Sequence, residues 1–462
     1  MQFNSIHFIL FLFLALTTTA LMPQKYRKIL LFVGSCYFYA VWDYRFLSLM
    51  IFSAAVDYVC GRKIYLTENL KVRKWYLITS VVCNLAVLGF FKYFNFFAES
   101  LQHLIGVSNP VLFNIVLPVG ISFYTFQSMS YTIDIYRKDI DPVTKAIDFF
   151  LFITFFPQII AGPIVRAREF LPQLDMPVIF KWKNIIDGVM LFLQGFVKKV
   201  LFADLLARYV DPVFSSPGHY SSIECALAVY GFAFQIYYDF CGYTDMATGV
   251  AKMFGFQLPL NFNHPYIATS LKMFWQRWHI TLSSWLKDYL YIPLGGNRGG
   301  KFIVMRNLVL TMFLGGLWHG AQWTFVIWGL YHGILLALEK FTFFSMAHTK
   351  EKSSLFILIV RNFAIFNLIC IGWIFFRAES LKSVMGIFGS LCKGTFAFDY
   401  SAAILSFALI LFFTFEILSF LSEKGVVNMQ KLNLVKCAAL GGAIPLAFIY
   451  SVQNVPFIYF QF

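Results

Sequence analysis

Long apolar runs, separated by short polar and charged stretches, recur along almost the whole chain. A helix that crosses a bilayer needs about 20 apolar residues, with ~17 as the lower limit. Runs near that length lie at residues 5–21, 29–42, 46–60, 75–91, 149–160, 186–203, 226–238, 303–317, 324–338, 355–376, 402–421 and 435–450. Because several of these runs are short, the pattern predicts roughly eleven transmembrane helices in an all-α, polytopic membrane protein.

Two stretches, residues 110–136 and 262–294, interrupt the apolar pattern with proline, glycine, asparagine and charged residues. Irregular backbone is stable at membrane depth only where it is buried in protein or lines a wet cavity. We therefore expect re-entrant or half-crossing helices there, around a central hollow. The chain is then one integral-membrane domain, with N-terminal spans at residues 1–105, a core at 106–345 and C-terminal spans at 346–462.

Composition supports a membrane protein. The chain has 59% hydrophobic, 20% aromatic and 13% charged residues, whereas soluble domains have about 45–50% apolar and about 25% charged residues. Its net charge of +14, from 37 basic and 23 acidic residues, is spread over short clusters between the apolar runs. Such clusters are typical of topology signals and of contacts with membrane lipids, and we expect no nucleic-acid partner.

The basic clusters also predict the orientation of the first spans. Lys25, Arg27 and Lys28 follow the first run, and a second cluster at residues 62–74 follows the third. The positive-inside rule then places the N-terminus on the extracytoplasmic side. No charged segment precedes the first run and no cleavage motif follows Leu21, so we expect this run to be retained as a span.

We expect no metal site and no disulfide framework. The eight cysteines form no Cys-x-x-Cys pair, and most lie in apolar runs, where cysteine packs as a small hydrophobe. The histidines lack the His-Glu-x-x-His spacing of zinc enzymes. The glycine run at residues 295–301 nearly matches a phosphate-binding P-loop, but Phe302 stands where a hydroxyl would bind magnesium. A flexible loop, in which Arg298 can contact phosphates, is the better interpretation.

One histidine, His319, lies within the apolar stretch between Val309 and Trp328. An ionisable side chain at membrane depth is costly, which makes it a functional-site hypothesis. A neutral imidazole can accept a proton from a hydroxyl during acyl transfer, and burial favours the neutral form. The alternative is structural, because Gly316 and Gly320 form a Gly-x-x-x-Gly pair that favours helix packing.

A second candidate segment, residues 274–291, reads FWQRWHITLSSWLKDYLY. Its tryptophans, tyrosines and charges cannot all face lipid, although an amphipathic helix at the membrane interface is an alternative. We expect the segment to line a reaction chamber. In that arrangement Arg277 and Lys287 are available for anionic groups, and His279 lies near His319.

Other polar residues in apolar surroundings favour structural roles. His332 lies 13 residues beyond His319, which on one continuous helix is about 220° around the axis and away from the same cavity. His264 precedes a proline, so we expect a turn. For residues 155–166 and 235–245 a cavity-shaping role is favoured over substrate contact.

Taken together, these segments resemble the membrane-bound O-acyltransferase (MBOAT) family, specifically its bacterial branch of alginate and peptidoglycan O-acetylation and teichoic-acid D-alanylation proteins. The resemblance covers most of the chain up to about residue 376. It runs through residues 118–127, 155–166, 235–245, 274–300 and 317–323. Its most specific parts are Phe-Trp-Gln-Arg-Trp-His-Ile-Thr-Leu-Ser and the Trp-His-Gly motif, whose histidine follows His279 by 40 residues.

The resemblance implies a ring of helices around a central channel that a donor and an acceptor reach from opposite sides. It assigns catalysis to His319 and a second functional position to His279. Arg277, Lys287 and Arg298 are expected to contact the phosphates of the donor. The channel is expected to be lined by Trp275, Gln276, Trp278, Trp318, Tyr238 and Asp239.

The resemblance further implies an enzyme without a permanently bound cofactor. Its donor would be a cytoplasmic acyl thioester, expected to be acetyl-CoA, and its acceptor an exported polysaccharide such as alginate. A separate extracytoplasmic acetyltransferase is the expected partner. The location implied is the bacterial inner membrane, with the N-terminus extracytoplasmic.

Three alternatives stay open. The first is a different acyl transfer, either of D-alanine to teichoic acid or of acetyl groups to peptidoglycan or cellulose. A transporter or flippase would show inverted repeats, of which the sequence has no trace, and would keep its activity without His319. A non-catalytic scaffold is the third alternative.

Overall fold

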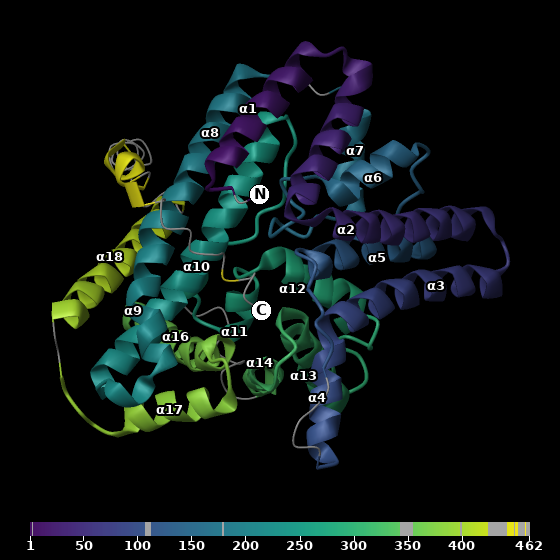
Figure 1. The fold of residues 1–462 in the computed structure, drawn as a ribbon. Helices are drawn as coiled ribbons and strands as arrows, with labels where there is room; N and C mark the ends of the chain where they lie inside the picture. The colour runs from purple at the N-terminus through teal and green to yellow at the C-terminus, as the bar shows by residue number, and fades with distance from the viewer. Residues whose placement is uncertain are drawn as a thin grey trace. The chain divides into compact units, whose positions relative to one another are not determined.

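The computed structural model describes residues 1, 3–106, 112–177, 180–341, 354–397, 400–423, 441–447, 449–450 and 458. Within these residues the chain consists of helices and loops without a strand (Figure 1), which confirms the predicted all-α class. The chain divides into two compact units. The first comprises Met1–Leu193 and Tyr243–Pro259, and the second comprises Gln194–Gly242 and Leu260–Phe462.

The described part contains four helical stretches that are long and apolar enough to cross a membrane: Leu70–Leu104, Lys301–His319, Phe356–Arg377 and Ala402–Leu421. Only 17% to 44% of their apolar windows is buried within the protein. Apolar side chains that face outward in this proportion are stable in lipid, where no hydrophobic penalty opposes their exposure. The membrane character predicted from composition is thereby supported, whereas the eleven crossings and the ring stay predictions.

The first unit contains α1 (Ile6–Leu21), α2 (Gln24–Leu66), α3 (Leu70–Leu88), α4 (Phe94–Leu104), α5 (Ile121–Arg137), α6 (Ala146–Thr154) and α7 (Ala167–Asp175). Ser5 caps α1 by accepting a hydrogen bond from the backbone N–H of Phe8 at 3.2 Å. Two predicted runs, 29–42 and 46–60, join in α2, which changes direction at Asp43, where φ is −162° and ψ is 114°.

A buried polar cluster connects α2, α3 and α5. Asp57 of α2 is fully buried and accepts hydrogen bonds from the hydroxyls of Ser80 and Ser128 and, at 2.8 Å, from the amide of Asn84. Between apolar helices, such hydrogen bonds hold neighbours together because their polar groups find no partner in lipid.

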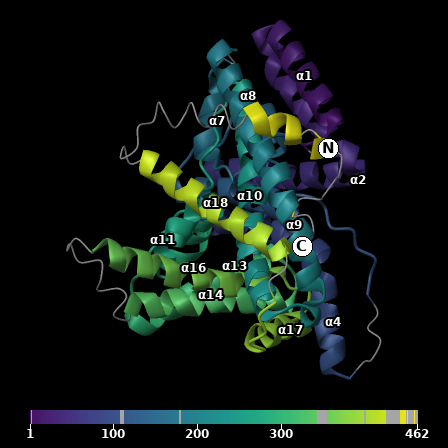
Figure 2. The same ribbon diagram turned by 90° about the vertical axis from the view of Figure 1, so that its left-hand side faces the viewer.

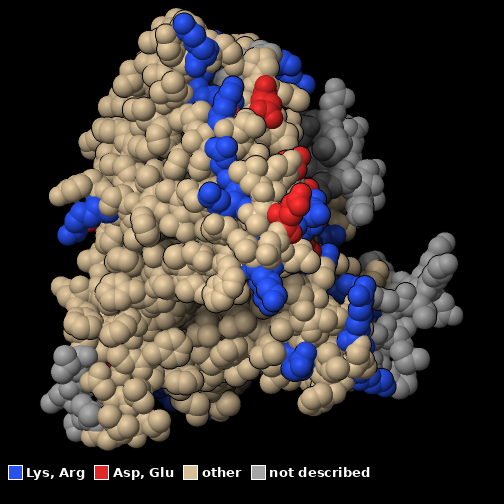
Figure 3. Space-filling model, turned by 90° about the vertical axis from the view of Figure 1, so that its right-hand side faces the viewer, with Lys and Arg blue, Asp and Glu red and all other residues tan. Residues whose placement is uncertain are grey.

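Basic side chains gather where α2 ends, α3 begins and α5 ends. The exposed members are Arg62, Lys63, Lys71, Lys74, Arg137 and Lys138. Arg73 is buried instead and donates to the backbone carbonyl of Tyr136 at 3.1 Å, which joins α3 to α5. Figure 3 views the side on which the α2–α3 turn lies and shows many basic side chains and few acidic ones.

The second unit contains α9 (Asp204–Ser215), α11 (Leu271–Trp275), α12 (Ile280–Leu286), α13 (Lys301–His319), α14 (Trp323–Phe341), α16 (Leu355–Arg377), α17 (Leu381–Cys392) and α18 (Tyr400–Glu423). Two long helices, α8 (Trp182–Val197) and α10 (Ser222–Met253), have residues in both units. Helices α13, α14 and α16 run side by side, as Figure 2 shows.

Glycines allow α13 and α14 to pack closely. A Cβ atom on Gly316 would lie 2.3 Å from the carbonyl oxygen of Phe325, and one on Gly329 would lie 2.4 Å from that of Met312. Gly316 therefore serves helix packing, as the structural alternative for this motif predicted. Its partner is Gly329 of α14, however, since Gly320 lies beyond the end of α13.

The interrupted stretch at residues 262–294 is indeed a series of short elements: a 3-10 turn at Pro265–Ile267, then α11, α12 and a π-helical turn at Lys287–Tyr291. His264 begins the 3-10 turn, as expected, and its Nδ1 lies 2.6 Å from Glu416 Oε2. By contrast, residues 121–137 form one continuous helix, α5.

Two predicted apolar runs differ from the structure or are described only in part. The run at 149–160 is helical only to Thr154, the end of α6, and residues 435–440 and 448 of the run at 435–450 lie outside the described residues. The chain leaves helical conformation between His319 and Trp323, so His332 belongs to α14 and shares no continuous helix with His319.

Candidate active site

His319 is the last residue of α13. The glycine that follows it allows the backbone to pass close to the ring of Phe325. Gly320 is extended, with φ −158° and ψ 151°, and a Cβ atom on it would lie 2.1 Å from the ring of Phe325. The His319 side chain is 5% exposed. Its ring centroid lies 5.1 Å from that of Trp328 and 5.2 Å from that of Phe376. An imidazole is thus held among aromatic rings at the end of an apolar helix.

His279 lies just before α12 in a backbone conformation that is unusual for its residue type. Its φ of 41° and ψ of 54° fall in the left-handed region, which costs a non-glycine residue about 1–2 kcal/mol. Strained residues of this kind cluster at functional sites, where the surrounding structure enforces them. Here the side chain is fully buried, and the strain sets the direction of the imidazole.

One asparagine determines which nitrogen of His279 carries the proton. Asn261 Oδ1 accepts hydrogen bonds from the backbone N–H of Thr281 at 3.2 Å and from its hydroxyl at 2.9 Å. The same oxygen lies 3.2 Å from His279 Nδ1. A carbonyl oxygen can only accept, so Nδ1 is the protonated nitrogen and Nε2 carries the lone pair of the neutral ring.

The structure brings the two predicted histidines together. The ring centroids of His279 and His319 are 6.3 Å apart. Trp318 lies beside both, 5.8 Å from His279 and 5.0 Å from His319. The expected proximity of the two histidines is confirmed, and the indole of Trp318 belongs to their shared aromatic surroundings.

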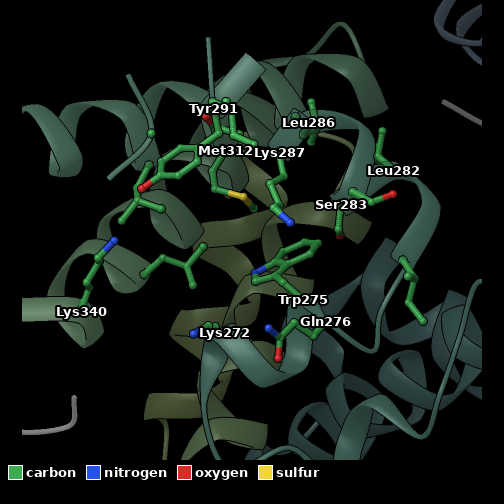
Figure 4. Close-up of a pocket in the computed structure, with 18 of the residues that line it drawn as sticks. Lys272, Trp275, Gln276, Leu282, Ser283, Leu286, Lys287, Tyr291, Met312 and Lys340 are labelled. Carbon is green, nitrogen blue, oxygen red and sulfur yellow. The ribbon is translucent and has the colours of Figure 1, made fainter. Parts of the chain in front are cut away.

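A pocket of about 800 Å³ is lined by residues of α11, α12, α13 and α14 (Figure 4), and His319 is part of its lining. A cavity of this size holds a small molecule or the arm of a larger one. Its lining is Lys272, Trp275, Gln276, Ile280, Leu282, Ser283, Ser284, Leu286, Lys287, Tyr291, Ile292, Gly296, Asn297, Leu308, Thr311, Met312, Gly315, His319, Trp328, Leu336, Glu339 and Lys340. His279 is not part of this surface.

The pocket is long and follows one face of each of two antiparallel helices. On α13 its lining extends from Leu308 to His319, eleven residues or about 17 Å at 1.5 Å per residue. On α14 it extends from Trp328, beside His319, to Lys340, or about 18 Å. The lysine and the histidine therefore mark opposite ends of the pocket.

Cationic side chains line the pocket, and two of them, Lys272 and Lys340, lie at its open end, where Lys272 is exposed. Lys272, Lys287 and Lys340 line the pocket together with a single acid, Glu339. Lys340 donates to Asn297 Oδ1, and burial together with the charge of Lys272 holds the pKa of Lys340 below its usual range. In Figure 4 Lys272 and Lys340 lie on the same side of the pocket, whereas Lys287 and Trp275 point toward one another in its middle.

Of the residues predicted to contact donor phosphates, Lys287 lines the pocket, whereas Arg277 and Arg298 do not. The guanidinium of Arg277 donates to the carbonyl of Asn263 at 2.9 Å and lies over the ring of Phe420, so this charge is engaged away from the cavity. Arg298 is exposed in the loop before α13.

Of the residues predicted to line the channel, Trp275 and Gln276 line the pocket. Trp278 is fully buried beside Phe274 instead. Tyr238 is also fully buried. Asp239 forms an ion pair with Lys199 at 2.6 Å and accepts from the backbone N–H of Ile458 at 2.7 Å.

Several residues of the site carry no signal in the sequence. Asn261 lies 18 residues before the histidine that it contacts. Lys272 and Lys340 come from different helices and look like ordinary charges at the ends of apolar segments. No group of three or more His, Cys, Asp and Glu that could hold a metal ion occurs among the described residues.

Comparison with known proteins identifies the family. The family model described as membrane-bound O-acyltransferase matches residues 137–381, which include both histidines. The chain belongs to this family. The family recognised from sequence motifs is thereby confirmed, and the protein is an O-acyltransferase.

This O-acyltransferase is similar over most of its length to proteins named for alginate or peptidoglycan O-acetylation and for teichoic acid D-alanylation. It is 42% identical over 395 residues to the probable alginate O-acetylase AlgI of Azotobacter vinelandii, covering 84% of this chain and 77% of that protein. It is 38% identical over 389 residues to the peptidoglycan O-acetyltransferase of Helicobacter pylori, covering 78% and 73%. It is 29% identical over 285 residues to the teichoic acid D-alanyltransferase of Bacillus subtilis, covering 58% and 70%.

Proposed function

We propose that this acyltransferase moves an acetyl group from a cytoplasmic thioester toward a hydroxyl of an exported polysaccharide, with His319 as the general base. The observation that carries this proposal is the position of His319, buried at the inner end of a long pocket whose open end is cationic. A buried imidazole can take the proton of an attacking hydroxyl and return it to the leaving thiolate.

His279 supports this chemistry as a hydrogen-bond acceptor. A role in polarising the acyl carbonyl would require a hydrogen-bond donor directed at the substrate. With the proton on Nδ1 and directed at Asn261, the neutral ring has a lone pair on Nε2 and cannot donate from that atom. The role that fits is to position a proton-bearing neighbour of His319.

The donor that fits the pocket is an acyl thioester on a phosphopantetheine arm, as in acetyl-CoA. The thioester would lie at His319 and the arm along the face of α13 from Met312 to Leu308. Its phosphate would lie near Lys272 and Lys340, about 17–18 Å away along the helices. Ammonium groups attract phosphate as point charges.

The acceptor that we propose is alginate or a related exported glycan, because relatives named for alginate and peptidoglycan O-acetylation are each about 40% identical to this chain. A separate extracytoplasmic acetyltransferase would receive the acetyl group. The second candidate is D-alanyl transfer from a carrier protein, which the more distant teichoic acid relative favours.

The membrane arrangement that we propose is a multi-pass protein of the bacterial inner membrane, with roughly eleven crossings around a central channel. The basic end formed by α2, α3 and α5 would face the cytoplasm, in accordance with the positive-inside rule. The N-terminus is then extracytoplasmic.

Replacement of His319 tests the catalytic proposal. We expect His319→Ala to lower acetate ester on the secreted polysaccharide by about 100-fold or more, because a general base contributes about 10²- to 10⁴-fold. His103→Ala, at an exposed histidine of α4, is the matched control and should retain normal ester content. Unchanged esters in His319→Ala at normal expression would refute catalysis and leave a transporter or scaffold.

The donor is tested with the purified protein. We expect consumption of acetyl-CoA by the native protein and none by His319→Ala. Consumption of carrier-bound D-alanine with no effect on acetyl-CoA would replace the acetyl donor by the second candidate.

A further inference from the structure

Two indole N–H groups of the pocket find no acceptor among the atoms of the described residues. The Nε1 atoms of Trp275 and Trp328 are buried and have no hydrogen-bond partner in the part of the chain that the structure describes, although both residues line the pocket. An N–H donor left unsatisfied in a buried site costs about 1–3 kcal/mol. Proteins keep such donors where a substrate supplies the acceptor, as in sites that stabilise a developing oxyanion.

Only one of these indoles lies beside the proposed base. The ring of Trp328 is 5.1 Å from that of His319 and nearly perpendicular to it, at 85°. Trp275 lies behind Trp328, with 5.7 Å between their ring centroids. An oxyanion donor must reach the same carbonyl group that the activated hydroxyl attacks, so proximity to His319 selects Trp328.

The surroundings of Trp328 hold its ring in one orientation. The side chain is 1% exposed, stacks on Trp373 at 6.1 Å and 20°, and contacts Phe376 at 5.3 Å. The indole N–H of Trp373 differs in that it donates to the hydroxyl of Tyr266 at 3.2 Å. A donor that is already fixed needs no reorganisation when charge develops, which is the basis of electrostatic catalysis.

We propose that Trp328 Nε1–H donates a hydrogen bond to the acyl carbonyl oxygen as it becomes an oxyanion, an inference that rests on the proposed acyl transfer at His319. The acceptor oxygen attacks the carbonyl carbon while its proton passes to His319. The carbonyl π electrons move onto the oxygen, where Trp328 stabilises the charge. Collapse of the tetrahedral intermediate re-forms the carbonyl and expels the thiolate, which takes the proton from His319.

The test removes the N–H but keeps the aromatic ring. We expect Trp328→Phe to lower kcat by about 10²- to 10³-fold, the effect of losing one oxyanion donor, with little change in the donor KM. Trp285→Phe, at another buried tryptophan that does not line the pocket, is the control for altered ring packing and should retain kcat per mole of folded protein, even if its thermal midpoint falls. A kcat in Trp328→Phe within about threefold of the control would overturn the proposal.

A second substitution removes doubt about folding. Benzothienylalanine at position 328 keeps the shape of tryptophan but replaces the N–H by sulfur, and it should reproduce the loss of kcat. Full activity of this protein would refute the donor role. His319→Ala separates the two proposals. Activity near the native level in His319→Ala contradicts acyl transfer at His319. A loss of about 100-fold or more there, beside a fully active Trp328→Phe, contradicts only the role of Trp328.

Discussion

At the scale of single residues, the site depends on side chains whose position is enforced by neighbours. His279 is held in left-handed backbone conformation, and Asn261 accepts from the backbone of Thr281, which leaves no freedom in the direction of its amide oxygen. The proton of His279 is therefore fixed on Nδ1. The sequence predicted both histidines, but it could not predict this tautomer, because the asparagine that determines it belongs to no motif.

The lysines at the open end of the pocket lead to a prediction about pH. Burial and the charge of Lys272 lower the pKa of Lys340, so Lys340 loses its proton at a lower pH than an ordinary lysine. We expect kcat/KM for the phosphate-bearing donor to fall as pH rises through this lowered pKa. Lys272→Gln removes the repulsion and should move the fall to higher pH, and Lys340→Gln should abolish it. Initial rates measured between neutral and alkaline pH check both expectations.

The magnitude of these effects is limited by the exposure of the lysines. Each substitution should lower kcat/KM for the donor about three- to tenfold at neutral pH, the range for partly exposed charge-assisted contacts. Lys301→Gln, at an exposed lysine outside the pocket lining, should leave the profile unchanged. Identical profiles for the native protein and Lys340→Gln would exclude Lys340 from donor binding.

At the scale of elements, the contact between α13 and α14 places the base relative to the pocket. Gly316, Gly329 and Gly333 let the two backbones approach until a Cβ atom at any of them would meet backbone atoms of the other helix at 2.3–2.8 Å. The same contact brings Trp328 of α14 against His319 of α13. Small residues therefore serve both the packing and the geometry of the site, and the two interpretations of the Gly316 motif are compatible.

Gly329→Ala tests this contact. The added methyl would lie 2.4 Å from the carbonyl oxygen of Met312, which forces the helices apart and should cost about 1–3 kcal/mol of stability. We expect a lower thermal midpoint in detergent and a reduced kcat, because His319 and Trp328 separate. Gly389→Ala in α17, where a Cβ atom meets nothing within 4 Å, should be neutral or slightly stabilising. Equal behaviour of the two variants would show that α13 and α14 tolerate a wider spacing.

At the scale of the whole molecule, the distribution of charge is the basis of the proposed orientation in the membrane. The basic side chains at the α2–α3 turn and at the end of α5 form a local concentration of positive charge (Figure 3). Cytoplasmic loops carry such an excess of lysine and arginine. The proposed thioester donor is cytoplasmic, so the orientation determines from which side of the membrane the donor would reach the protein.

Labelling of single cysteines tests the orientation. In a Cys392→Ser background, which removes an exposed native thiol, Lys71→Cys should react with a membrane-impermeant maleimide only after the cells are opened. Tyr44→Cys, at the exposed kink of α2, should react in intact cells. The unmodified background measures labelling of the remaining cysteines. Labelling of Lys71→Cys in intact cells would reverse the proposed topology.

The sequence by itself determined the membrane character, the all-helical class, the family and the two histidines. These properties depend on the length of apolar runs and on short contiguous motifs, such as the one around His279 and the Trp-His-Gly motif at His319. Both kinds of signal lie within short segments of the sequence, so they can be recognised without knowledge of the tertiary structure. Even the broken helices at 262–294 follow from local glycine, proline and charge.

Only the tertiary structure decided which side chains share the site. Arg277, two residues before His279, donates to Asn263 and does not line the pocket. Lys272 and Lys340 come from separate helices and meet at the open end of the pocket. The partner of Gly316 proved to be Gly329 rather than Gly320, and the indole of Trp328 came to lie against His319. The physical reason is that such contacts depend on which faces of different helices pack together, and side-chain packing between helices is not encoded in any single segment.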